Sequence, residues 1–161
     1  MAVDSDSYGT AAGVAGYTAL YVKPTGAYTT TTTPTLAAVE KWINEVSSTT
    51  NAALASFRFV VPVTETKSVK MLTGLVEQAV AELCAYANKE GRFFGGDAPP
   101  SGTVQGVMRK EIYAWVEMNA RGMENMGATR NEDETGEDDT LQIGVLSLNF
   151  AAHGDDPEMT S

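Results

Sequence analysis

The chain contains few residues of the kinds that carry acid–base, nucleophilic or metal chemistry. Its one histidine, His153, lies 69 residues from its one cysteine, Cys84. Catalytic dyads need such side chains at hydrogen-bond distance, and zinc sites need several of them in a cluster. Cys84 stands among apolar residues at helical spacing, which indicates a small buried hydrophobic side chain rather than a nucleophile. The sequence therefore predicts a protein that is not an enzyme and has no metal centre.

Two other motifs resemble ligand sites only loosely. Residues 133–139 (DETGEDD) contain clustered acids, but they lack the order of a calcium loop, and Gln142 stands where that loop needs a glutamate. This run is interpreted as a solvated acidic linker, with a weak divalent-ion site as the alternative. The glycines of GTAAGVAG (Gly9, Gly13 and Gly16) follow no hydrophobic strand and precede no lysine, unlike a phosphate loop. We expect no cofactor.

The negative charge of the chain is concentrated at its C-terminal end. Of 161 residues with a formal charge of -10, residues 131–161 carry nine acids and no lysine or arginine. The first 130 residues, with 12 acids and 11 bases, are nearly neutral, so no basic surface for gripping nucleic acid is expected. No signal peptide and no apolar run of about 18 residues is found, which predicts a soluble protein made in a cytoplasm.

A long helix is predicted over residues 34–57. Thr33 is expected to cap it, with Pro34 at the first helical position, where a missing N–H costs nothing. Apolar or tolerated residues then recur at alternating steps of three and four, the spacing of one helix face. They are Leu36, Val39, Ile43, Val46, Thr50, Ala53 and Phe57.

Two further helices are predicted over residues 65–89 and 103–122. The stripe of the first is Val69, Leu72, Val76, Ala79, Leu83 and Tyr86. The stripe of the second is Val104, Met108, Ile112, Trp115 and then Met118 or Asn119. Amphipathic helices with short links predict an all-α fold, a small three- to four-helix bundle over residues 34–127.

Both ends are predicted to extend from this bundle. Residues 1–33 are interpreted as an extended arm, in which residues 17–22 (YTALYV) form a short strand or extended piece, and the threonines before Pro34 act as a hinge. Residues 128–161 are interpreted as an acidic tail containing a short strand at 141–150 (LQIGVLSLNF). Because a lone strand needs a partner, it is expected to pair with another copy, another protein or the N-terminal arm.

Aromatic and aliphatic residues in these segments are the candidate interface residues. Phe93 and Phe94 lie in a turn-rich loop, which either folds back onto the bundle or fills an interface. The complete set is Tyr8, Tyr17, Tyr21, Phe93, Phe94, Leu141, Ile143, Val145, Leu148 and Phe150.

Three segments resemble the head–tail connector proteins of tailed bacteriophages, the adaptors that dock beneath the portal. Residues 33–63 resemble their opening helix, which has a T-x-P-T-like cap, then V-E-x-x-I, and later V-P. The matching residues are Thr33, Pro34, Thr35, Val39, Glu40, Ile43, Leu54 and Pro62. Residues 79–94 (AVAELCAYANKEGRFF) resemble the second helix, and residues 121–130 (RGMENMGATR) resemble the end of the third. The leader at residues 8–22 is also similar, whereas residues 131–161 lie outside the match.

The resemblance implies a structural virion protein at the head–tail junction, made in the bacterial host cytoplasm. Such a subunit forms a ring of twelve copies, binds the portal and the downstream neck or tail proteins, and lets DNA pass through the lumen without specific binding. It implies no catalytic residues, cofactor or membrane contact. The alternatives are a soluble helical binding or regulatory module, or another neck component such as a stopper or tail-completion protein, for which a β-rich core is expected.

Overall fold

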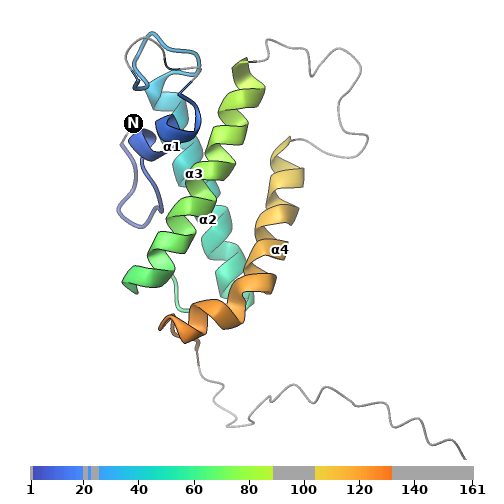
Figure 1. Ribbon diagram of the computed structural model, residues 1–161. Coiled ribbons are helices and arrows are strands. Elements are labelled where there is room, and N and C mark those ends of the chain that lie inside the picture. Colours follow the sequence, from blue (N-terminus) through green and yellow to red (C-terminus); the bar gives the residue numbers. More distant parts are fainter. Residues whose placement is uncertain (1, 20–21, 23–25, 89–103, 132–161) are drawn as a thin grey trace, which may run out of the picture. The chain divides into compact units, whose positions relative to one another are not determined.

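Four helices form the part of the chain that the computed structural model describes, namely residues 2–19, 22, 26–88 and 104–131. They are α1 (Ala11–Tyr17), α2 (Leu36–Ser56), α3 (Thr66–Asn88) and α4 (Val104–Asn125), and no strand occurs among these residues. The three long helices run alternately up and down, and α1 lies across one side of them (Figure 1). The all-α prediction is confirmed for these residues, while the predicted strand at 141–150 lies outside them.

Helices α2 and α3 each pack against the other three helices, and they pack most extensively against one another. The predicted stripe supplies the buried face of α2: Val39, Ile43, Val46, Thr50 and Ala53 are buried, and Leu36 and Phe57 are partly buried against the core. Fully burying one such aliphatic side chain stabilises the fold by about 1.5–3 kcal/mol, so this single stripe supplies much of the driving force.

The start of α2 differs from the prediction. Thr35, not Thr33, is the N-cap, and its hydroxyl accepts the Ala38 N–H. Pro34 precedes the helix and is buried. The threonines before it form a hydrogen-bonded turn: the Thr29 N–H donates to the Thr32 hydroxyl at 2.9 Å, and that hydroxyl donates to the Pro34 carbonyl at 2.8 Å. The predicted hinge is therefore a turn held by its own side chains.

The predicted extended arm is largely folded onto the bundle. Within residues 2–19 it contains α1, capped by Thr10, whose hydroxyl accepts the Gly13 N–H. Tyr8 and Val14 from this segment, and Val22 and Tyr28 further on, are buried in the same core as α2. The prediction was wrong because the alanines and glycines of α1 let it pack closely on α2 and α3 without a long apolar stripe.

A second stripe on α2, polar rather than apolar, holds this N-terminal segment. Asn44, Ser47 and Asn51 follow one another at steps of three and four, directly beside the apolar stripe. The Asn44 side chain accepts the Asp4 N–H at 3.0 Å, and the Ser47 hydroxyl accepts the Tyr8 N–H at 2.9 Å. Extended backbone thus finds partners on a helix surface, which satisfies polar groups that burial would otherwise leave unpaired.

Helices α3 and α4 complete the bundle, and α4 packs more closely on α2 than on α3. Leu72, Val76, Val80 and Cys84 form the buried face of α3. The buried face of α4 is Met108, Ile112, Val116, Ala120 and Met123. This face is rotated from the predicted stripe, because Val116 replaces Trp115 in the core and Met118 is 77% exposed.

The chain after α4 returns to the chain after α2. Both helices end with the same arrangement of hydrogen bonds, in which Phe59 N–H reaches the Leu54 carbonyl and Ala128 N–H reaches the Met123 carbonyl. The residue that turns the chain has a positive φ in both places: it is Gly127 after α4 and, at a steric cost, Arg58 after α2. Phe59 and Arg130 then form an antiparallel bridge. The body extends to Asn131 rather than to residue 127.

The arginine at this bridge makes two further contacts. Its guanidinium lies 4.9 Å from the centre of the Phe59 ring and contacts the Glu124 carboxylate at 2.5 Å.

None of the helices in the described part of the chain combines the length and hydropathy needed to cross a membrane.

Replacing Ser47 with alanine tests the polar stripe. The Ser47→Ala variant loses the acceptor of the buried Tyr8 N–H, so we expect the free energy of unfolding to fall by about 1–2 kcal/mol. Urea denaturation followed by circular dichroism measures this change. The control is Ser48→Ala, which alters the next residue of α2 at an exposed position and is expected to change stability by less than about 0.5 kcal/mol. Equal effects of the two substitutions would contradict the role of Ser47.

Candidate functional site

The structure describes only two of the candidate interface residues, Tyr8 and Tyr17, and their side chains differ in exposure to solvent. Tyr8 is 3% exposed, so its side chain serves the interior of this chain. Tyr17 is the last residue of α1 and is 59% exposed. The other eight lie outside the described residues: Tyr21, Phe93, Phe94, Leu141, Ile143, Val145, Leu148 and Phe150.

Tyr8 connects three segments through its hydroxyl group. The hydroxyl accepts the Val63 N–H at 2.8 Å and donates to Asn51 Oδ1 at 2.7 Å. Burial raises the pKa of Tyr8 above its ordinary value of 10.0, the Val63 hydrogen bond partly opposes this, and the negative charge of Asp6 adds to it. This arrangement holds a proton firmly and suits a structural role.

Cys84 is buried in α3, as the sequence predicts. Burial raises the pKa of its thiol, against a smaller opposing effect of a hydrogen bond with Tyr28. Because the thiolate is the reactive form, the raised pKa and the lack of access both keep this sulfur inert. Among the described residues, no three histidine, cysteine, aspartate or glutamate side chains gather where they could hold a metal ion.

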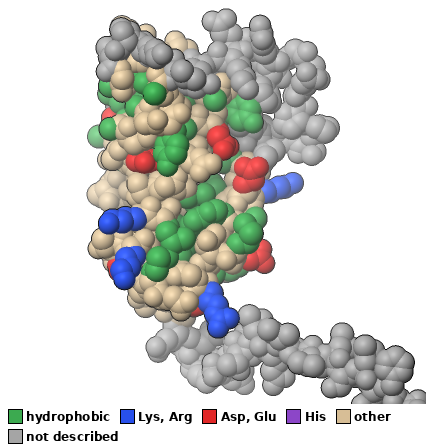
Figure 2. Space-filling view, in the orientation of Figure 1, with side chains coloured by type: hydrophobic (Ala, Val, Ile, Leu, Met, Phe, Trp, Pro, Cys, Tyr) green, Lys and Arg blue, Asp and Glu red, His purple; other side chains and the backbone are tan. Residues whose placement is uncertain are grey.

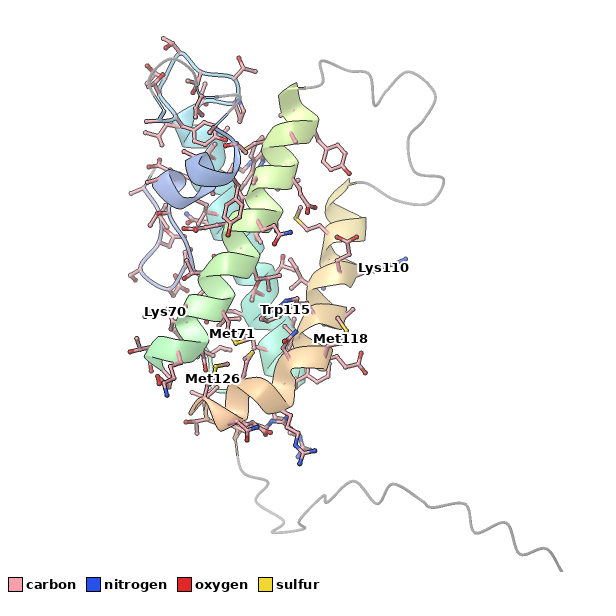
Figure 3. All side chains as sticks on the ribbon, in the orientation of Figure 1. Lys70, Met71, Lys110, Trp115, Met118 and Met126 are labelled. Carbon is pink, nitrogen blue, oxygen red and sulfur yellow. The ribbon has the colours of Figure 1, made fainter. Side chains whose placement is uncertain are left out.

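An exposed apolar surface lies on α3 and α4. We call it the methionine patch and define it as Met71, Leu75, Trp115, Met118 and Met126. Met71 and Trp115 point toward one another from α3 and α4, with Met126 near the end of α4 (Figure 3). Met118 lies one helical turn from Trp115 on the same side of α4, since residues three apart are surface neighbours. Trp115 and Met126 touch the core with one side and leave the other uncovered.

A groove of about 370 Å³ lies between α3 and α4, and three residues of the patch, Met71, Leu75 and Trp115, line it. Its lining residues are the buried Ala79, Met108 and Ile112, the half-exposed Met71, Leu75 and Trp115, and the exposed Gln78, Glu82 and Glu111. Hydrophobic side chains gather on the face that α3 and α4 present in this view (Figure 2). The groove is therefore apolar along its floor and acidic at the end where Glu82 and Glu111 lie.

A second groove, between α2 and α4, has a different character. It measures about 560 Å³ and carries Arg109 together with the polar side chains of Asn44, Ser48 and Thr49. Its apolar lining, which includes Leu83 and Met108, makes up a smaller share of its surface than the apolar lining of the groove between α3 and α4 does. Of the two grooves, the one along the methionine patch is better suited to bind an apolar segment.

The sequence pattern placed Trp115, and then Met118 or Asn119, on the core stripe of α4 and so missed the patch. A signal was present in the sequence. Val116, Ala120 and Met123 offer a second apolar series one position further on, so the helix has more apolar surface than one core face requires. A surplus of this kind marks a surface that binds something else.

No protein-family model, no curated protein and no solved structure matches this chain.

Replacing Tyr8 with phenylalanine tests the connecting role of its hydroxyl. At pH 7 the Tyr8→Phe variant should lose about 1–2 kcal/mol of unfolding free energy, because the buried Val63 N–H loses its acceptor. Since the folded-state pKa of Tyr8 is raised, the wild-type chain loses stability as the pH rises past 10.0, and the variant lacks this contribution. The difference between the two proteins should therefore narrow between pH 9 and pH 11.

Urea denaturation at a series of pH values measures this difference. The exposed Tyr17 supplies the control, since Tyr17→Phe removes the same hydroxyl from a side chain at the surface. Its effect should stay within about 0.5 kcal/mol at pH 7. A gap between wild type and Tyr8→Phe that widens with pH would show that the pKa of Tyr8 is lowered by folding, contrary to this account.

Proposed function

We propose that this chain is a structural subunit of a bacteriophage head–tail connector, which assembles as a ring beneath the portal and links the capsid to the tail. In this role it carries out no catalysis and needs no cofactor. It binds its own copies, the portal protein and downstream neck or tail proteins, and DNA passes through the lumen without specific binding. The protein is made in the host cytoplasm and ends in the virion.

The segments that resemble connector proteins correspond to helices of the body. Residues 33–63 cover α2 and the extended piece after it, and residues 79–94 include the second half of α3. Residues 121–130 cover the end of α4 and the bridge to Phe59. The resemblance therefore falls on the residues that build the bundle, which is where a family likeness in fold would lie.

The methionine patch is the observation that carries the proposal. A half-buried tryptophan beside an exposed methionine and two half-buried ones is typical of binding surfaces, because tryptophan provides much of the energy of association and methionine adapts to its partner. The 77% exposure of Met118 leaves apolar area in water that an assembly would cover. A subunit that works by association needs such a face.

The alternatives fit these observations less well. A stopper or tail-completion protein is expected to have a β-rich core, whereas the described residues form four helices. A monomeric binding or regulatory module would use the patch for a partner and would not form rings. These two functions differ in the mass of the protein in solution.

Mass measurement and portal binding test the proposal. We expect native mass spectrometry of the purified chain, alone or mixed with the portal ring of the same phage genome, to show a multi-copy ring or a ring bound to the portal.

We also expect the gene to lie in the head–tail assembly region, directly after the capsid gene. The body of the first 130 residues is nearly neutral, so duplex DNA should bind weakly or not at all at physiological salt. A strict monomer with no affinity for portal rings would contradict the connector function.

A further inference from the structure

Next to the methionine patch lies a glycine that the fold of this chain does not require. Gly122 lies in the last turn of α4, which ends at Asn125, four residues after Met118 and four before Met126. A Cβ atom placed there would meet nothing within 4 Å, so internal packing does not call for glycine. The bare backbone at this one position, between Met118 and Met126, leaves room for another chain to approach closely.

The charges around the patch indicate what kind of segment fits. Lys70 and Lys110 flank it from α3 and α4 (Figure 3). Both are exposed, and neither forms an ion pair with the described residues. Glu82 and Glu111 lie at the far end of the groove. Lys110 directly precedes Glu111, so Lys70, which precedes Met71, is the lysine at the opposite end of the groove from the two glutamates. The matching partner is an apolar segment with acidic residues at one end, placed so that its acids meet Lys70 and avoid Glu82 and Glu111.

One segment of this chain has that composition. Residues 141–150 (LQIGVLSLNF) are apolar at alternate positions at their start, and the ten residues before them, 131–140, include six acids and no base. We propose that the methionine patch of one copy binds residues 141–150 of a second copy, with the acidic run toward Lys70. This inference rests on the self-association in the proposed function and names the two surfaces that meet.

The dimensions agree with this pairing. Bound as an extended strand, residues 141–145 would place the side chains of Leu141, Ile143 and Val145 on one face over about 13 Å, at ~3.3 Å per residue. Helix α3 rises about 17 Å from Met71 to Glu82 at ~1.5 Å per residue. The groove therefore has room for these three side chains in a row. Asn131, the last described residue, precedes Leu141 by ten residues, which reach at most about 35 Å and so can bridge to a neighbouring copy.

Two full-length variants separate the surfaces. The patch variant, Met118→Glu, puts a charge at a position that is 77% exposed, so its fold should survive. The tail variant carries Leu141→Ser, Ile143→Ser and Val145→Ser. Each should self-associate at least tenfold more weakly than wild type in sedimentation velocity at matched concentrations. The control, Ala52→Glu, adds the same charge at an exposed position of α2 and should associate like wild type.

Mixing the two variants tests whether the contact joins different copies. The patch variant still has an intact tail, and the tail variant still has an intact patch. If one copy binds the tail of another, the mixture should form a one-to-one complex that neither variant forms alone, visible by native mass spectrometry. Two variants that dissociate and fail to complement each other would overturn the proposal, since the tail would then not act between copies.

Other outcomes are also decisive. If both variants associate like wild type, the inference is wrong and the connector function is untouched. If Met118→Glu keeps its self-association but loses portal binding, the patch belongs to the portal contact and the inference fails. If the variants complement each other but the wild-type chain shows no affinity for portal rings, the inference stands and the connector function fails.

Discussion

The fold depends on one constraint: α2 must pack an apolar stripe into the core and bind the N-terminal segment with an adjacent polar stripe. Its apolar stripe, from Val39 to Ala53, packs in the core, and its polar stripe of Asn44, Ser47 and Asn51 binds the N-terminal segment. Because the two stripes share the same period, a shift of one would misplace the other. The weak helix formers in the middle of α2 are thus explained by their partners, since Ser47 and Thr50 are both buried and hydrogen-bonded.

The sequence predicted the parts of this fold whose packing depends on a single helix face. The stripes of α2 and α3 are long and regular, so the hydrophobic period specified both helices. It also specified most of the buried residues of α2, whereas the buried face of α3 is rotated toward Val80 and Cys84 and leaves Tyr86 exposed. The N-terminal segment was mispredicted because it packs through small residues and polar contacts to positions about forty residues away, such as Tyr8 to Ser47. No local pattern records such a pairing. In α4 the apolar surface is wider than its core face, so the period alone did not show which part is buried.

The candidate site follows the same logic. Charged and polar residues cover much of the body, yet α3 and α4 diverge enough to leave Trp115 half exposed and a groove beside it. Sequence reasoning selected aromatic residues near the chain ends because such segments lacked partners, and it placed Tyr8 among them. The structure instead gives Tyr8 an internal role, while the surface suited to binding lies on the helices. Whether a residue is free for a partner depends on tertiary packing, which composition does not reveal.

The bridge between Phe59 and Arg130 has a mechanical consequence. The Val60 N–H donates to the Thr129 carbonyl at 2.9 Å, and the Asn131 N–H donates to the Arg58 carbonyl at 2.7 Å. A pull on the chain beyond Asn131 is therefore shared between the end of α4 and the end of α2. Phe59, 1% exposed, anchors this junction in the core. Tension on the last thirty residues would load the end of α2 as well as the end of α4, so it would not simply peel α4 away from its neighbours.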